Sequence, residues 1–285
     1  MNLIETIERR TSVRTFNGLR PDENVMKSLR DSAERATDDL PECFANVKRP
    51  VLVIADNFST TEKPGTYGVI SGARSYVMMG YDKTPEAMLL AGYVFERFII
   101  SCTELLIGTC WLGGTFSHSA FQKKYDEESA KSAKAYDVGI VSPLGHATPR
   151  KRFAERMMRR VARSDKRKPF NTLFSGVEPP SERNMTIAAT QPENRMPLTD
   201  AISIALEMVR IAPSSSNSQP WQGKVETSGD KATVTLTCTT SNRFSHIDMG
   251  IALYHFHATM VYLGYNADLT LGQSLTFNVS TKKHV

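Results

Sequence analysis

AMLLAGYVFERFIISCTELLIG, residues 87–108, is the most apolar stretch of this 285-residue chain. Its length approaches that of a membrane-spanning helix, but Glu96 and Arg97 lie at its middle and Glu104 lies near its end. Charges at that depth are costly in a lipid bilayer. We therefore interpret the stretch as a central core helix that begins near Pro85.

A second stretch has a comparable pattern. Gly92 begins the segment GYVFERFIISCTELL, and Gly250 begins the segment GIALYHFHATMVYLG. Gly264 of the second segment falls at the offset that Leu106 occupies in the first. The helices and strands predicted around the two segments also repeat in part, which indicates an internal duplication.

The other elements follow from apolar periodicity and from the positions of proline and glycine. We expect helices at 4–10, 21–36 and 199–211 and from 248, and strands at 50–55, 73–79, 136–141, 221–227 and 232–239. Four prolines lie between 174 and 197, which indicates a linker. The predicted organisation is a first half at 1–173, this linker at 174–197, and a shorter second half at 198–285.

The composition indicates a soluble globular protein, with 40% hydrophobic and 23% charged residues. The opening MNLIETIERR is typical of an amphipathic helix rather than a secretory signal, so we expect a cytoplasmic protein. The four cysteines lack C-x-x-C spacing and are expected to be reduced thiols. His255 and His257 are two residues apart on a predicted helix and point to different faces, so we predict no metal site.

RRTSVRTF, residues 9–16, places three arginines and three hydroxyl side chains in one short segment. Arginine offers a planar fork of donors, and serine and threonine add short hydrogen bonds. Such a set can bind a phosphate and the polar edge of a ring together. The alternative for this segment alone is a solvated basic turn.

APSSSNSQPW, residues 212–221, follows a predicted helix that Pro213 ends. Ser214, Ser215, Asn217 and Gln219 can present donors and acceptors to a flat heteroaromatic ligand. A plain polar loop is the alternative, and the flanking prolines and tryptophan make it less ordinary.

RRTSVRTF resembles the opening motif of the FMN-dependent nitroreductase family, and APSSSNSQPW resembles that family's most distinctive loop. GTCWLGGTF, residues 108–116, is similar to the stretch after the family's central helix, and PRKR, residues 149–152, is similar to its basic pair on the FMN phosphate. The resemblance implies an α+β fold of the nitroreductase type. That fold is a three-layer α/β/α arrangement with a mixed, mainly antiparallel sheet, here duplicated within one chain.

The resemblance also implies roles for individual residues. Those implied to bind FMN are Arg10, Thr11, Ser12, Arg14, Gly113, Gly114, Arg150, Arg152, Pro213, Ser214, Ser215 and Asn217. The first three would lie against the phosphate and ribityl chain, with the pair at 150 and 152 completing the phosphate site. Arg14 would face the pyrimidine edge of the flavin, Gly113 and Gly114 its reactive nitrogen, and residues 213–217 would cover it from the second half. No side chain is predicted as catalytic, because the flavin carries the hydride.

The activity implied is ping-pong hydride transfer, in which NADH or NADPH reduces FMN and a nitroaromatic, quinone or similar small molecule is then reduced. One alternative is a flavin-binding protein without turnover. Another is nucleic-acid binding through the basic segment 150–168, since the net charge is +5. We favour a solvated helix that attracts anionic cofactors for that segment and expect no nucleic-acid or membrane partner.

The chain also departs from the family pattern. Ordinary members carry both the RRTSVR-type and the SNSQPW-type segment in one subunit, and two subunits exchange them to build two sites. This chain, with its two expected halves, carries each segment only once in its sequence. This resembles a single-chain branch that folds as an imitation of the dimer, so a monomer with one FMN would suffice, and further homodimerisation is left open. Leu106 replaces a glycine that is usual before the turn at 108–116.

Overall fold

The computed structural model describes residues 1–56, 58, 65–129, 136–148, 166–191 and 196–281. The chain forms two compact units, each assembled from separate segments. The N-terminal unit comprises residues 9–38 and 48–164, and the C-terminal unit comprises residues 1–8, 39–47 and 165–285.

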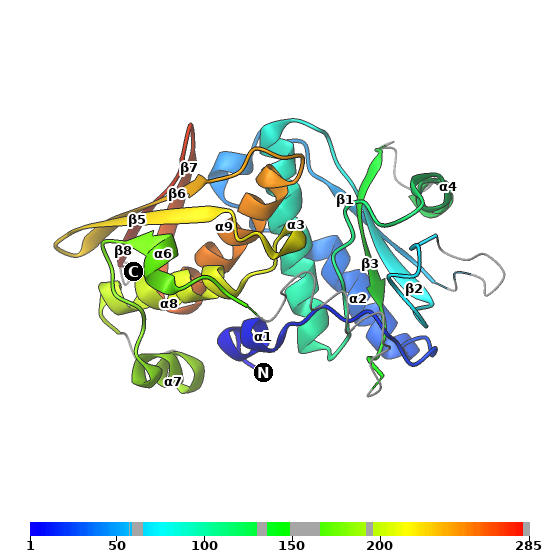
Figure 1. The fold of residues 1–285 in the computed structure, drawn as a ribbon, viewed down its shortest axis with the longest axis horizontal. Helices are drawn as coiled ribbons and strands as arrows, with labels where there is room; N and C mark the ends of the chain where they lie inside the picture. The colour runs from blue at the N-terminus through cyan, green and yellow to red at the C-terminus, as the bar shows by residue number, and fades with distance from the viewer. Residues whose placement is uncertain (57, 59–64, 130–135, 149–165, 192–195, 282–285) are drawn as a thin grey trace. The chain divides into compact units, whose positions relative to one another are not determined.

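The N-terminal unit is built on a three-stranded antiparallel sheet in the order β1-β2-β3 (Figure 1). Its strands are β1 (Val51–Ala55), β2 (Ser75–Gly80) and β3 (Val138–Leu144), and its helices are α2 (Glu23–Arg35), α3 (Pro85–Glu104) and α4 (His118–Ser129). The helix α2 packs against α3 and β1, and α4 packs against β1 and β3. All six residues of β2 are buried, which fits its central place in the sheet.

The helix α3 confirms the interpretation of the apolar stretch as a core helix. Pro85 occupies its first turn, where a missing N–H costs nothing, and the Thr84 hydroxyl caps it by accepting from the Ala87 N–H at 3.2 Å. Its buried residues run almost without interruption from Leu89 to Ile100, so they cover every side of the helix. No helix in the described part of the chain is long and apolar enough to cross a membrane.

The C-terminal unit contains a five-stranded sheet in the order β4-β5-β6-β8-β7. Figure 1 labels its strands β5 to β8. Its strands are β4 (Phe174–Ser175), β5 (Trp221–Ser228), β6 (Lys231–Cys238), β7 (Tyr265–Leu271) and β8 (Leu275–Thr281). Among the described strand pairs of this sheet, only the short β4–β5 pair is parallel. Buried and exposed residues alternate along β5 and β7, as expected for strands with one face in the core.

The helices of the C-terminal unit are mostly short. They are α1 (Leu3–Arg9), the 3₁₀ turns η1 (Glu42–Phe44) and η2 (Ser215–Asn217), α6 (Phe170–Leu173), α7 (Glu182–Thr190), α8 (Leu198–Ile211) and α9 (Ser245–Tyr262). The two long helices α8 and α9 pack against each other, and α9 also packs against β7. The turn η1 lies against β7, far from it in sequence.

The expected α+β class with a mainly antiparallel arrangement is confirmed. The segment expected as a linker, residues 174–197, contains the strand β4 and the helix α7. The sequence analysis did not predict α4, β7 or β8. The boundaries of the two compact units also differ from the halves expected at 1–173 and 198–285, because residues 1–8 and 39–47 join the C-terminal unit.

The long helices α3 and α9 end in the same way. Leu105 and Leu263 close the two helices with nearly equal dihedrals, φ −80° and ψ 6° against φ −81° and ψ 7°. The next residues, Leu106 and Gly264, both take positive φ, at 60° and 84°. The offset noted in the sequence therefore corresponds to one repeated helix terminus.

Candidate functional site

The RRTSVRTF segment extends through the N-terminal unit beside the turn that follows α3. Ser12 pairs with Thr109 in a parallel β-bridge, and the Val13 N–H donates to the Thr109 carbonyl at 2.7 Å. Two of the motifs singled out in the sequence are thus hydrogen-bonded to each other.

The same segment is bonded to two further loops. Arg14 accepts from the Ser71 N–H at 2.9 Å through its carbonyl, and the Phe16 N–H donates to the Ser71 carbonyl at 2.8 Å. The Thr148 N–H donates to the Thr15 carbonyl at 3.1 Å. The PRKR motif follows Thr148 directly, and its Arg150 and Arg152 lie outside the described residues.

Two glycines allow this close approach. A Cβ on Gly108 would lie 2.9 Å from the Val13 side chain, and a Cβ on Gly145 would lie 3.1 Å from the Phe16 ring. Gly108 and Gly145 also pair with each other in an antiparallel bridge. The absence of side chains at both positions lets the arginine-bearing segment lie flat against the turn.

The predicted residues of this segment have different surroundings. Arg10 is buried, and its Nε lies 4.0 Å from the Glu96 Oε1, while Thr11 is exposed and Ser12 is half-buried. The Nη1 atom of Arg14 is buried, and no described residue accepts a hydrogen bond from it. A buried guanidinium donor of this kind requires an acceptor.

The turn after α3 is anchored before it reaches the two predicted glycines. Leu112 exchanges two backbone hydrogen bonds with Val141 of β3, at 2.9 and 3.0 Å. Gly113, which is half-buried, and the exposed Gly114 follow immediately. The indole N–H of Trp111 donates to the Glu96 Oε2 at 2.8 Å.

The serine loop, residues 212–219, lies in the C-terminal unit and continues from α8. Three of its non-glycine residues take left-handed conformations, namely Ser216, Asn217 and Gln219, with φ of 52°, 54° and 47°. Such conformations cost free energy and persist only where surrounding contacts enforce them. The loop's internal bonds include the Gln219 N–H donating to the Ser214 hydroxyl at 2.9 Å.

The enforcing contacts come from residues 166–168, the described end of the basic segment. The Arg167 guanidinium donates to the Asn217 side-chain oxygen at 2.5 Å and to the Ile211 carbonyl at 3.0 Å. Lys168 donates to Gln219 twice, from its backbone N–H at 2.8 Å and from its ammonium at 3.0 Å. We expected a solvated helix for 150–168, but its described end, residues 166–168, is hydrogen-bonded to the serine loop. We call this set of hydrogen bonds from Arg167 and Lys168 the clasp.

Asp248 in α9 supports the loop by a different contact. Its Oδ1 accepts from the Ser215 N–H at 2.9 Å, and its buried Oδ2 has no hydrogen-bond partner among the described residues. Burial raises the pKa of Asp248 to about 7, and the Ser215 N–H opposes part of that rise. Pro213, two residues before Ser215 in the serine loop, is half-buried.

The sequence analysis missed Glu96, Trp111, Arg167 and Asp248 as residues that organise these segments. A charged residue inside an apolar helix was the available signal for Glu96 and Asp248, because such groups are seldom buried without a specific partner. Nothing comparable distinguishes Arg167 among the many basic residues around it.

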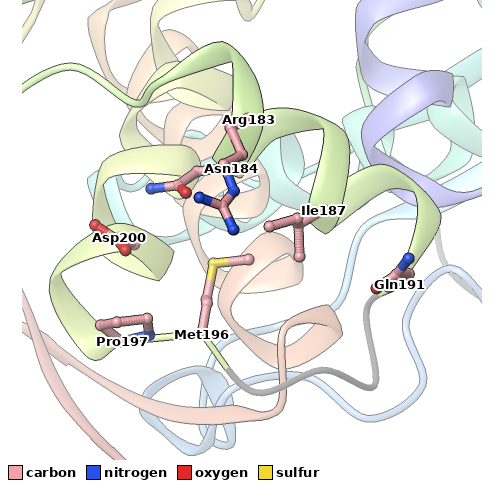
Figure 2. A pocket seen from close by; sticks show the side chains of 7 residues that line it. All are labelled: Arg183, Asn184, Ile187, Gln191, Met196, Pro197 and Asp200. Atoms are coloured by element: carbon pink, nitrogen blue, oxygen red, sulfur yellow. The ribbon is translucent and has the colours of Figure 1, made fainter.

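A separate pocket of about 280 Å³ lies between α7 and the start of α8 (Figure 2). Its described lining combines polar and apolar side chains: Arg183, Asn184, Ile187, Gln191, Met196, Pro197 and Asp200. None of these residues belongs to the set predicted to bind FMN.

Comparisons with known proteins agree with the fold. A family model described as "Putative TM nitroreductase" matches residues 2–260. A structure from Thermotoga maritima, described as a "putative nitroreductase", is similar at a TM-score of 0.58 and 20% identity, over 99% of this chain and 95% of that one.

Other similar structures match only part of the chain. A nitroreductase with bound FMN from Desulfitobacterium hafniense gives 17% identity and a TM-score of 0.39, over 53% of this chain and 92% of that one. A nitroreductase family protein from Clostridium difficile gives 15% identity and a TM-score of 0.43, over 60% and 96%. No curated protein sequence matches the chain.

The fold, together with an arginine-bearing segment held against a glycine turn, defines a protein of the nitroreductase class. Because the family model spans residues 2–260, the chain belongs to this family of nitroreductase-like proteins.

Proposed function

We propose that this protein is an FMN-dependent NAD(P)H oxidoreductase of the nitroreductase type. The observation that carries the proposal is the junction in the N-terminal unit where the RRTSVRTF segment is bonded to the turn at residues 108–109 and to Thr148. It brings two of the four family-like motifs next to each other and bonds Thr148, the residue before the PRKR motif, to the first of them. The family membership supports the same class of activity.

The residues at this junction fit FMN. The buried Nη1 of Arg14, for which no described residue is an acceptor, offers a donor to the pyrimidine edge of a flavin. Thr11 and Ser12 add short donors for the ribityl and phosphate oxygens, and Arg150 and Arg152 are proposed to complete the phosphate site. Several of the structures similar to this chain are described as nitroreductases with bound FMN, which supports FMN as the proposed cofactor.

Bound FMN would supply the hydride chemistry, and the protein's own groups would bind, orient and stabilise. A fixed cation at Arg14 favours negative charge on the pyrimidine edge. Gly113 and Gly114 permit close approach of the backbone to the ring. Arg10 is proposed for the phosphate, where a charge-assisted hydrogen bond is stronger than a neutral one.

The second half is proposed to contribute Pro213, Ser214, Ser215 and Asn217, and this part of the proposal rests on the resemblance of the sequence. Asn217 already accepts from Arg167, so its contribution would be to hold the loop's shape. Ser215 would act mainly through the placement of its backbone beside Asp248.

We propose NADH or NADPH as the donor and a small nitroaromatic, quinone or similar molecule as the acceptor, each using the site in turn. The test is to load the purified protein with FMN, add NADH or NADPH without air, and follow the flavin's visible absorbance. Bleaching, followed by recovery when a quinone is added, is the expected result. FMN binding without bleaching by either nucleotide would identify a flavin-binding protein without turnover, and failure to bind FMN would overturn the proposal.

A further inference from the structure

We propose that Glu96 is a positioning residue for the FMN site. It holds Arg10, which is proposed to bind the phosphate, and the turn at residues 108–116, which is proposed to lie beside the flavin ring, in one fixed geometry. The inference rests on the proposed function. Glu96 contacts neither substrate nor flavin in this account, and acts through Arg10 and Trp111.

The geometry around Glu96 supports this role. Its carboxylate is fully buried in α3, and the two oxygens face different partners. Oε2 accepts from the indole N–H of Trp111 at 2.8 Å, and Oε1 lies 4.0 Å from Nε of the buried Arg10. One side chain of the core helix therefore joins the start of the RRTSVRTF segment to the turn that ends in Gly113.

Packing alone does not account for a carboxylate at this place. An ionised carboxylate in an apolar interior is costly unless it is paired and hydrogen-bonded. The neighbouring residues of α3, Phe95 and Val94, are fully buried, so an apolar side chain would be compatible with the helix. Glu96 is thus best explained by its two polar partners.

Trp111 is able to transmit this constraint. Its ring packs edge-on against Phe95, with centroids 4.6 Å apart and an angle of 68° between the planes. The indole is held by packing on one side and by Glu96 at its N–H. Since Gly113 follows two residues later, the position of Trp111 and the backbone hydrogen bonds between Leu112 and Val141 together direct the turn at Gly113.

Two substitutions test the contact of Glu96 with Arg10 and its contact with Trp111 separately. Glu96→Gln keeps a carbonyl oxygen for the indole N–H but removes the charge that orients Arg10. Trp111→Phe keeps a ring against Phe95 but removes the donor to Glu96. Glu86→Gln, in the exposed first turn of the same helix, is the matched control.

The experiment titrates flavin-free wild type and the three variants with FMN and with riboflavin, which lacks the phosphate. Loss of one oriented charge-assisted contact corresponds to about tenfold in affinity. We expect Glu96→Gln to weaken FMN binding about tenfold and riboflavin binding much less. We expect Trp111→Phe to weaken both by similar factors and to alter the visible spectrum of the bound flavin, and Glu86→Gln to match wild type.

The outcomes distinguish this inference from the proposed function. If wild type binds neither flavin, the proposed function is wrong and the inference falls with it. If wild type binds FMN while Glu96→Gln binds it equally or more tightly, the positioning role is wrong and the function stands. Unchanged affinity for both flavins in Trp111→Phe would also overturn the role, and it keeps the test decisive if Glu96→Gln does not fold.

Discussion

Leu106 adopts a conformation that favours glycine. Its φ is 60°, and its side chain is 58% exposed, so little burial compensates for the backbone cost. The corresponding residue after α9 is Gly264, whose φ is 84°. A Cβ added at Gly264 would have no described atom within 4 Å. The two positions therefore form a natural pair for measuring that cost.

Leu106→Gly is expected to stabilise the protein by about 1 kcal/mol, because the left-handed conformation costs a non-glycine residue roughly 1–2 kcal/mol and glycine loses part of that gain as chain entropy. Gly264→Leu should destabilise by a similar amount. Thermal unfolding measures both, at roughly 2–4 °C per kcal/mol for a protein of this size class. A lower midpoint for Leu106→Gly than for wild type would show that the side chain has a role we have not identified.

Asp248 makes stability depend on pH. Its carboxyl has a folded-state pKa of about 7, well above the ordinary value near 3.8, so the folded state holds the proton that the unfolded chain releases. The wild type should therefore lose stability as pH rises from about 4 to about 7, by up to roughly 4 kcal/mol. Asp248→Asn lacks that loss, and its unfolding midpoint relative to wild type should increase across this window. A difference that stays constant with pH would contradict the assignment.

At the scale of elements, the serine loop combines local strain with external support. Ser216, Asn217 and Gln219 take left-handed conformations, and Arg167 holds Asn217 while Lys168 holds Gln219 by two hydrogen bonds. The clasp makes the loop's shape depend on a distant part of the sequence. We therefore expect energetic coupling between the clasp residues and the residues of the serine loop that they contact.

A double-mutant cycle tests the clasp. Arg167→Ala and Asn217→Ala should each lower the free energy of unfolding, and the double variant should lose less than the sum by about 1–2 kcal/mol, because one hydrogen bond to a charged group is shared. Chemical denaturation supplies the four free energies. Strict additivity would mean that the contact contributes nothing to the stability of the loop.

The basic segment supplies a second test at this scale. Reversing the charge at Arg150 and Arg152 should weaken FMN binding more than tenfold, since charge-assisted bonds of this type contribute roughly 1.5–3 kcal/mol each. The same reversal at Arg159 and Arg160 should have a much smaller effect. Isothermal titration with FMN compares the pairs, and equal losses would indicate a diffuse basic field rather than a phosphate site.

At the scale of the whole molecule, the sequence predicts most of the core. The apolar run at 87–108 and the alternation in β5 and β6 were sufficient to place α3 and those strands, because both patterns are local. The strands β7 and β8 have the same alternation but were missed, and they find their places only through pairing with β6. Long-range pairing is decided by tertiary packing rather than by local pattern.

The candidate site was predictable to a similar degree. The motifs identified the segments that meet at Thr109 and Thr148, since each carries an unusual set of side chains. The contacts of Glu96, Arg167 and Asp248 were not predictable, because each joins residues far apart in sequence and depends on burial that a motif does not record. Local chemistry thus indicated the segments of the candidate site, and the folded structure shows the contacts that support each segment.

We propose that one chain provides one FMN site, because the RRTSVRTF and APSSSNSQPW segments occur once each. The most direct measurement is a titration of flavin-free protein with FMN at concentrations well above the dissociation constant, with the mass of the complex determined in parallel. We expect saturation at one FMN per chain. Saturation at two FMN per chain, or no binding, would contradict it.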